Sequence, residues 1–234
     1  MPSCKKFTGA TGLEPATSGV TGRRSNQLNY APRATDSVAG SVSRVAAVYT
    51  VRTYEASDEI GWVRCRVLSF LGSAFWDAVE REKEQYEHPA IELVAESDGG
   101  IVGLLDLECG TPALADPAGT GGMIWHIAVH PDHQRRGIAA ALLDEAERRA
   151  REQGLARLEA WTRDDAHVQR WYEAHGFAPV DRYLHVYLER EDLRQYDGEL
   201  RLVKAFAHYT GNRPDEIRQR YERVHDDVLY EKRL

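Results

Sequence analysis

The hydrophobic pattern of the chain changes several times between the alternation typical of strands and the longer period typical of helices. It predicts strands over residues 48–54, 91–96, 100–108, 123–129 and 156–162, and two closing strands at Phe177 and over 182–189. It predicts helices over residues 57–71, 73–87, 138–153 and 164–175, with a shorter charged helix over 214–224. Between two of the strands, Asp98-Gly99 supplies the positive φ of a tight hairpin turn. The order of these elements predicts a fold of the mixed α/β class.

Three segments of different character divide the chain. Residues 1–44 are rich in Gly, Ser, Thr and Ala and have no sustained apolar period, so we expect a disordered leader. Residues 45–190 carry the predicted strands and helices of one domain. Residues 191–234 are predicted to form a C-terminal extension that is partly helical. Its role is open among packing on the domain, covering an acceptor cleft and making a homodimer contact.

The leader has a second interpretation, which comes from the genetic code. Residues 24–30 can be back-translated so that the reverse complement resembles the D-arm of a transfer-RNA gene, and residues 12–15 resemble its T-arm in the same way. We therefore hypothesise that the leader is a non-native extension, translated antisense to such a gene from a start codon placed too early. The alternatives are a plain disordered tail and a basic nucleic-acid-binding arm, which the few, scattered charges favour least.

Charge narrows the expected partners. The chain has 30 Lys and Arg against 37 Asp and Glu, a net charge of −7. Residues 1–44 hold six bases and two acids (+4), so the rest of the chain is more acidic still, at −11. Such a surface has no general attraction for nucleic acid and suits a cationic partner.

Other features of the composition indicate the compartment. No segment has the roughly 20 consecutive apolar residues of a membrane-spanning helix, and the N-terminus lacks the apolar core of a secretory signal. Cys4, Cys65 and Cys109 are odd in number and far apart, so they are predicted to be unpaired thiols. We therefore expect a cytoplasmic protein that binds neither nucleic acid nor membrane.

The loop before the alanine-rich helix carries the strongest chemical signal. A predicted strand ends at Val129, Pro131 starts a turn, and the loop leads into the N-terminus of the helix. The first N–H groups of a helix have no partners within it and lie at the positive end of its dipole, so they bind phosphate without a charged side chain. Gly137 permits close approach of a diphosphate, and Arg135 and Arg136 add attraction for further phosphates.

This loop resembles the coenzyme-A-binding motif of the GNAT acyltransferases, written Arg/Gln-x-x-Gly-x-Gly/Ala. The chain supplies Gln134, Gly137 and Ala139 at the defined positions. A second segment, residues 171–177, is similar to the family's aromatic-Tyr-x-x-x-Gly-Phe, and its distance from the first motif is typical. The resemblance covers roughly residues 48–190. It implies the GNAT-like fold, a central mixed, mostly antiparallel sheet with flanking helices; the alternative is an ordinary strand–turn–helix with a packed aromatic residue.

The resemblance also implies a co-substrate, acetyl-CoA, whose thioester is attacked directly by an amine. Backbone groups at the splayed end of a strand would hold the pantetheine, an N–H group near Val129 would polarise the thioester carbonyl, and the loop N–H groups would hold the pyrophosphate. The predicted coenzyme-A-binding residues are Ile127, Ala128, Val129, Gln134, Arg135, Arg136, Gly137, Ile138, Ala139 and Ala140, together with Asp165 and Tyr172.

The predicted catalytic residues are Tyr172, His126 and Glu108. The resemblance implies that Tyr172 protonates the departing thiolate, and the alternative is a core tyrosine. Many members have Asn seven residues before this Tyr, where the chain has Asp165, which cannot donate an amide N–H to coenzyme A. The base that deprotonates the ammonium substrate is open among Asp106, Glu108 and His126; for His126 the alternative is a buried, hydrogen-bonded histidine.

No metal site is predicted. His126, His130 and His133 lie near one another in sequence, but a strand and a turn would aim them differently and no cysteine lies near. The sequence thus predicts an N-acetyltransferase that moves an acetyl group from acetyl-CoA to a primary amine of a small molecule or peptide. The alternative function is a non-catalytic acyl-CoA-binding regulatory module, and transfer of a larger acyl group also stays open.

Overall fold

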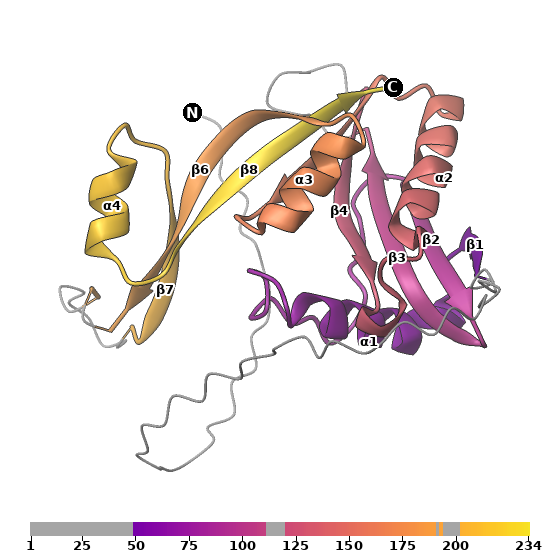
Figure 1. Ribbon diagram of the computed structural model, residues 1–234, viewed down its shortest axis with the longest axis horizontal. Coiled ribbons are helices and arrows are strands. Elements are labelled where there is room, and N and C mark those ends of the chain that lie inside the picture. Colours follow the sequence, from indigo (N-terminus) through magenta and orange to yellow (C-terminus); the bar gives the residue numbers. More distant parts are fainter. Residues whose placement is uncertain (1–48, 111–119, 191, 194–201) are drawn as a thin grey trace, which may run out of the picture. The chain divides into compact units, whose positions relative to one another are not determined.

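An eight-stranded sheet in the order β1-β2-β3-β4-β5-β8-β6-β7 organises the computed structural model (Figure 1). The structure describes residues 49–110, 120–190, 192–193 and 202–234. The strands are β1 (Thr50–Thr53), β2 (Ala90–Ser97), β3 (Gly100–Cys109), β4 (Gly121–Val129), β5 (Arg157–Thr162), β6 (Ala178–Glu189), β7 (Lys204–Tyr209) and β8 (Val224–Arg233). The helices are α1 (Glu59–Phe70), α2 (Ile138–Glu152), α3 (Ala166–Ala174) and α4 (Pro214–Arg220), with 3₁₀ turns at Ala56–Asp58 and Pro131–His133.

The predicted sheet type is confirmed. Among the strands that the structure describes, β4 and β5 pair in parallel and every other neighbouring pair is antiparallel. The hairpin between β2 and β3 also turns where it was predicted, with φ of 51° at Asp98 and 75° at Gly99. The predicted leader, residues 1–44, and most of the predicted loop over 110–122 lie outside the described residues.

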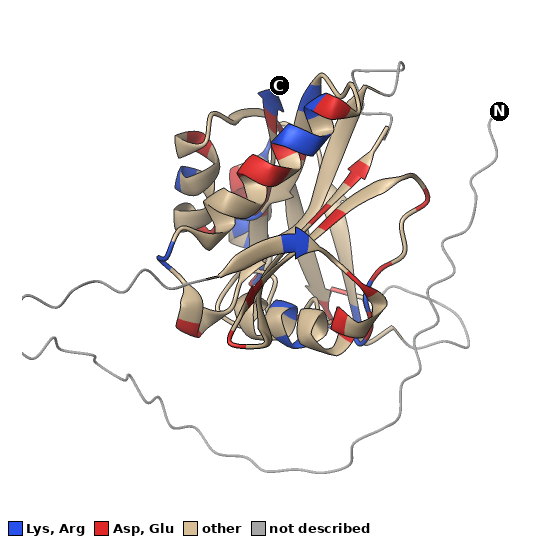
Figure 2. Cartoon of the chain, turned by 90° about the vertical axis from the view of Figure 1, so that its right-hand side faces the viewer, with Lys and Arg blue, Asp and Glu red and all other residues tan. Residues whose placement is uncertain are grey.

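Apolar side chains follow both phases of β2 and β3, so the sheet is covered on both faces. Leu93 and Leu105 belong to a core cluster that includes the apolar side of α2. Their neighbours Val94 and Leu104 belong to a second cluster with Trp62 of α1. α2 therefore packs on one face and α1 on the other (Figure 1). In the view of Figure 2, basic and acidic positions are interspersed over the described residues.

The segment between α1 and β2, residues 71–89, corrects the predicted helix over 73–87. It consists of turns and bends, which we call the α1–β2 loop. Its large side chains point to different parts of the molecule: the Phe75 ring lies under the Arg163 guanidinium, at 4.3 Å, whereas Lys83 is buried beside a carboxylate of β3. These long-range contacts outweigh a local helical pattern whose apolar residues would otherwise share one face.

The C-terminal segment is part of the sheet, which corrects the predicted boundary at residue 190. β8 lies between β5 and β6 and pairs with both along most of its length. In place of the two closing strands predicted at Phe177 and over 182–189 there is one strand, β6, which begins just after Phe177. The segment after residue 190 therefore joins the compact unit that spans residues 45–234, and its predicted helix is the short α4.

Candidate active site

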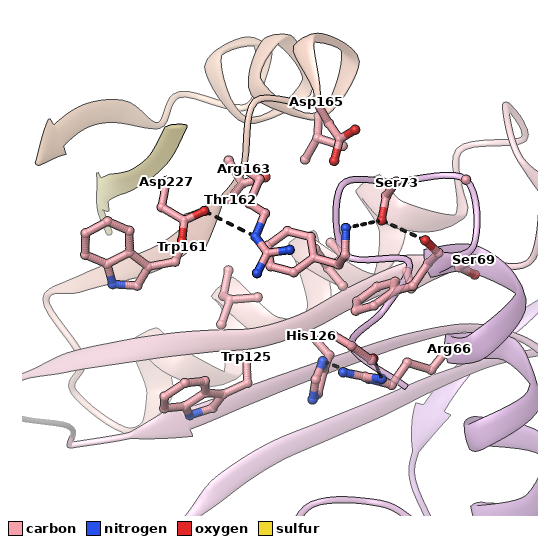
Figure 3. A pocket seen from close by; sticks show the side chains of 18 of the residues that line it. Arg66, Ser69, Ser73, Trp125, His126, Trp161, Thr162, Arg163, Asp165 and Asp227 are labelled. Atoms are coloured by element: carbon pink, nitrogen blue, oxygen red, sulfur yellow. Dashed lines mark hydrogen bonds and ion pairs between the residues drawn. The ribbon is translucent and has the colours of Figure 1, made fainter. Parts of the chain in front are cut away.

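β4 and β5 start side by side and then separate. Their parallel pairing ends at Ile124 and Ala160, although both strands continue. On its other side, β4 carries a bulge at Trp125, because its register with β3 shifts between Asp106 and Leu107. A cavity of about 690 Å³ lies at the separated ends (Figure 3).

The cavity is bounded by the α1–β2 loop, the end of β4, the connection from β5 to α3, and parts of β6, β7 and β8. Its charged lining side chains comprise four carboxylates against two guanidinium groups, from Glu80, Glu84, Asp165, Asp227, Arg66 and Arg163. This excess of negative charge favours a cationic occupant.

Beside the cavity, the entrance of α2 carries free backbone N–H groups. The first helical hydrogen bond runs from the Ala141 N–H to the Gly137 carbonyl, at 3.0 Å, and no side chain caps the helix. The N–H groups of Ile138, Ala139 and Ala140 precede that bond, so they remain available for an anion at the positive end of the helix dipole.

Side chains of the loop support this entrance from within. Gln134 Nε2 donates to the Val129 carbonyl at 3.3 Å, and the Arg136 guanidinium donates to the Asp132 carbonyl at 2.9 Å. Arg135 adopts a left-handed φ of 64°, a conformation that is uncommon for residues other than glycine. Arg136 therefore stabilises the loop in addition to its predicted contact with phosphate.

Tyr172 of α3 lines the cavity and is almost fully buried. Its ring stacks on Tyr230 of β8, with centroids 5.6 Å apart, and meets Phe177 edge-on at 5.2 Å. Burial raises the pKa of the Tyr172 hydroxyl well above its ordinary value, so the phenol keeps its proton at neutral pH. The ring contacts fit the alternative, a packed core tyrosine, and the role of Tyr172 as the acid stays a prediction.

His126 also lines the cavity, and both of its ring nitrogens are engaged. Arg66 Nε donates to Nδ1 at 3.4 Å (Figure 3), and Nε2 lies 3.1 Å from Glu84 Oε2. Because a guanidinium only donates, Nδ1 accepts and Nε2 carries the proton that is shared with the carboxylate. The hydrogen bond from His126 holds the pKa of Glu84 below its usual range, so that carboxylate is ionised at neutral pH. His126 is thus a buried, hydrogen-bonded histidine that reaches the cavity.

Glu108 lies outside the cavity lining. Its Oε2 accepts from Trp125 Nε1 at 2.8 Å, and its Oε1 accepts from the His88 N–H at 2.9 Å. Burial acts to raise the pKa of Glu108, but these hydrogen bonds outweigh it and the pKa is lowered. With both oxygens occupied, Glu108 holds the α1–β2 loop and the bulged residue against β3.

Asp106, the neighbouring candidate base, is also outside the cavity lining and is completely buried. Its Oδ2 lies 3.1 Å from Lys83 Nζ and accepts from the Tyr86 hydroxyl at 2.9 Å. Burial raises the pKa of Asp106, against the opposing charge of Lys83. Of the three candidate bases, only His126 reaches the cavity.

The structure brings some predicted site residues to one cavity and leaves others beside it. His126, Ile127, Ala128, Val129, Gln134, Asp165 and Tyr172 all line the cavity. Arg135, Arg136, Gly137, Ile138, Ala139 and Ala140 form the adjoining loop and first turn of α2. The individual binding and catalytic roles of these residues remain predictions.

Sequence reasoning missed several lining residues that the fold brings in from a distance. Glu84 comes from the segment predicted as helix, and Arg163 follows β5. His185, His208 and Asp227 come from three different strands, β6, β7 and β8, two of which lie in the predicted extension. Burial, helped by the charge of Arg163, lowers the pKa of His185 to about 4, so its imidazole is neutral at pH 7. Only the alternation of polar residues within β6 and β8 could have indicated such a cluster.

Comparison with known proteins identifies the family. Residues 59–177, about half of the chain, match the acetyltransferase (GNAT) family. The chain belongs to the GNAT acetyltransferase family. An acetyltransferase of Pectobacterium atrosepticum is 30% identical over 121 residues, which cover 51% of this chain and 78% of that protein. One from Yersinia enterocolitica is 28% identical over 119 residues, covering 49% and 77%.

Solved structures agree on the fold. A GNAT acetyltransferase from Staphylococcus aureus superposes with a TM-score of 0.51 at 16% identity, covering 80% of this chain and 99% of that one. The ribosomal-protein-S18-alanine N-acetyltransferase from Escherichia coli superposes with a TM-score of 0.50 at 16% identity, covering 80% and 94%. The GNAT chain is thus an acyltransferase of the acetyl-CoA-dependent class. Within the described ranges, no helix is both long enough and apolar enough to cross a membrane.

Proposed function

We propose that this GNAT chain transfers an acetyl group from acetyl-CoA to a primary amine of a cationic small molecule or peptide. The observation that carries the proposal is the cavity at the separated ends of β4 and β5. Tyr172 lines it from α3, and the free N–H groups of α2 adjoin it. Coenzyme binding, proton transfer and acceptor binding can therefore take place in adjoining parts of one cavity.

The residues present suit coenzyme A. The N–H groups of Ile138, Ala139 and Ala140 would bind the pyrophosphate, and Gly137 presents no side chain there: an added Cβ would meet only the Tyr49 hydroxyl, at 3.7 Å. Backbone groups of β4 beyond Ile124 have no β5 partner, so they are free for the amide-bearing pantetheine. Acetyl-CoA itself would supply the activated thioester.

Two groups of this chain would handle the protons. Tyr172, protonated because burial raises its pKa, would donate to the leaving sulfur. On the other side of the reaction, the ionised Glu84 carboxylate would accept a proton from the ammonium group, directly or through a water molecule. His126 and Arg66 would orient Glu84, because His126 Nε2–H donates to it and Arg66 fixes the other ring nitrogen.

The acceptor is expected to be a cation because the carboxylates that line the cavity outnumber its guanidinium groups. The unpaired thiols of Cys65 and Cys109, both buried, support a location in the cytoplasm. The homodimer contact of the C-terminal segment remains a prediction.

The test is a panel of primary amines with acetyl-CoA, read out by released thiol. We expect turnover with at least one class of cationic amine. Tyr172→Phe should lower kcat by roughly 10²- to 10⁴-fold while acetyl-CoA still binds. Tyr221→Phe, which removes a hydroxyl outside the cavity, is the matched control and should keep the parental kcat.

Two results would contradict the proposal. Acetyl-CoA binding without turnover on any amine class would instead favour the acyl-CoA-binding regulatory module. An unchanged kcat in Tyr172→Phe would leave this tyrosine as a packing residue and move the acid elsewhere.

A further inference from the structure

Three potential metal ligands from three neighbouring strands converge on the cavity. They are His185 of β6, His208 of β7 and Asp227 of β8, and one donor atom of each lies within 4.8 Å of the others. The β6–β7 register places His185 directly opposite His208. All three residues line the cavity. Elsewhere in the described part of the chain, no three such side chains come equally close, the histidines of the predicted phosphate loop included.

Two polar atoms of this cluster are buried without a hydrogen-bond partner. They are His185 Nε2 and Asp227 Oδ1, and Oδ1 has an ion pair with Arg163 Nε at 3.5 Å that does not form a hydrogen bond. The two side chains are only 8% and 7% exposed. Buried polar atoms in folded proteins almost always have a partner, because leaving one unpaired is costly. Unpaired donors and acceptors at the same place therefore indicate that something else binds there.

We propose that His185, His208 and Asp227 bind a divalent first-row transition-metal ion of the Zn²⁺ class. Two imidazoles and one carboxylate are the ligand set that such ions prefer, and three protein ligands leave at least one coordination position open. His208 is exposed on the edge strand β7, with its ring against Tyr183 at 4.2 Å. A small shift of this exposed side chain would bring the three donor atoms to the metal–ligand distances of about 2 Å that such ions require. The proposal stands independently of acetyl transfer.

Arg163 orients the carboxylate of this site. Its Nε lies 3.5 Å from Asp227 Oδ1 (Figure 3), and its guanidinium is fixed by a 2.6 Å hydrogen bond to the Ala74 carbonyl. The other oxygen, Oδ2, lies 3.6 Å from His185 Nδ1, on the side of the histidines. Such outer contacts commonly hold metal ligands in place. The positive charge of Arg163 also opposes a cation, so the expected affinity is moderate.

His225 lies close to this group but has another partner. Its Nδ1 is 2.8 Å from Asp164 Oδ1, and Arg223 donates to its Nε2 at 3.1 Å. With both ring nitrogens engaged, His225 is not part of the proposed ligand set.

The test is titration of the tag-free full chain, stripped with a chelator, with Zn²⁺ in a calorimeter. We expect one Zn²⁺ per chain. In His208→Ala the affinity for Zn²⁺ should fall by about 100-fold or more, which exceeds the loss typical when a residue that only contacts a metal ligand is replaced. Asp227→Asn should show a loss of the same order. His175→Ala, which removes a histidine from the end of α3 outside the cavity, is the matched control and should bind Zn²⁺ like the parent.

Cobalt supplies a second measurement that reports the ligands directly. Co²⁺ bound at this site should give visible absorption bands in the parent and in His175→Ala, but not in His208→Ala. Because His208 is exposed, its replacement should leave the circular dichroism spectrum unchanged, which separates lost binding from lost folding. Absence of Zn²⁺ binding by the parent, or equal binding by His208→Ala, would overturn the proposal.

Discussion

Asp165 accepts a hydrogen bond from the backbone N–H of Ala74 at 2.9 Å, across 91 positions of the sequence. The carbonyl of Ala74 accepts from Arg163 at 2.6 Å. Both backbone groups of one residue in the α1–β2 loop are thus bound by the connection that leads into α3. The Asp165 carboxylate therefore shapes the wall of the cavity.

Replacing this carboxylate should loosen the wall. Asp165→Ala leaves the Ala74 N–H without its acceptor, and we expect the free energy of unfolding to fall by about 1–3 kcal/mol. KM for the amine should rise, because the loop lines the cavity. Asp165→Asn keeps an acceptor oxygen, so both quantities should stay close to those of the parent. The free energy of unfolding is measured with urea and KM from initial rates. Equal losses in the two variants would mean that the charge, not the acceptor, holds the loop.

The left-handed conformation of Gly137 offers a test of the phosphate loop with an internal control. Gly137 lies just before α2 with a φ of 82°, and Gly154 lies just after it with a φ of 80°. Both positions have space for a Cβ. Alanine at either position should cost about 1 kcal/mol of stability, because L-residues disfavour this φ. Only Gly137→Ala should also weaken acetyl-CoA binding, measured by calorimetry. The strained backbone there would relax by moving the neighbouring N–H groups of α2, which are assigned to the pyrophosphate. Weaker binding in both variants would contradict the assignment of the loop.

The raised pKa of Tyr172 predicts how kcat depends on pH in the alkaline range. An unperturbed tyrosine titrates near 10.0, and burial raises the pKa of Tyr172 above that value. The phenol therefore remains a proton donor up to at least about pH 10, and kcat at saturating acetyl-CoA should show no loss of this acid below that pH. The same shift lowers folding stability above about pH 10, because the unfolded tyrosine ionises first. A fall in kcat centred clearly below pH 10 that disappears in Tyr172→Phe would contradict this role.

Local patterns predicted the local parts of the structure. The apolar spacing of residues 138–153 identified α2, and Asp98-Gly99 identified the hairpin, because each depends on neighbours within a few residues. The free N–H groups before Ala141 follow from the same kind of signal, a strand end leading through Gly137 into a helix. These are the features for which sequence spacing and spatial contact coincide.

Features made by distant contacts were not predictable in this way. Residues 73–87 have a helical pattern, yet Phe75 and Lys83 are held by partners far along the sequence. β8 inserts between β5 and β6, and nothing in the pattern of the last residues shows which strands they will join. The cluster of His185 and Asp227 exists only because of that insertion.

The ion pair between Asp77 and Arg223 predicts how stability depends on pH. Arg223 donates to both carboxylate oxygens, at 2.6 and 3.1 Å, and this contact lowers the pKa of Asp77 from 3.8 to about 2. Because the folded pKa is lowered, the stabilisation is present above about pH 4 and is lost as the pH falls toward 2. We expect Asp77→Asn to lower the free energy of unfolding by about 1–2 kcal/mol at pH 7 and to match the parent near pH 2. Asp144→Asn, on the exposed side of α2, should change it by less than about 0.5 kcal/mol; a penalty for Asp77→Asn that persists at low pH would argue against the ion pair.

The insertion of β8 makes the last strand necessary for folding, which a pair of valines can test. Val228 of β8 is 5% exposed and packs in the core cluster with α2, whereas Val203, just before β7, is 55% exposed. Val228→Ala should lower the free energy of unfolding by about 2 kcal/mol, from the lost burial of two methyl groups and the cavity that remains. Val203→Ala should change it by less than about 0.5 kcal/mol. The free energy of unfolding of both variants is measured with urea. A small change at both positions would mean that the C-terminal segment is a dispensable extension and that β5 and β6 are held together without it.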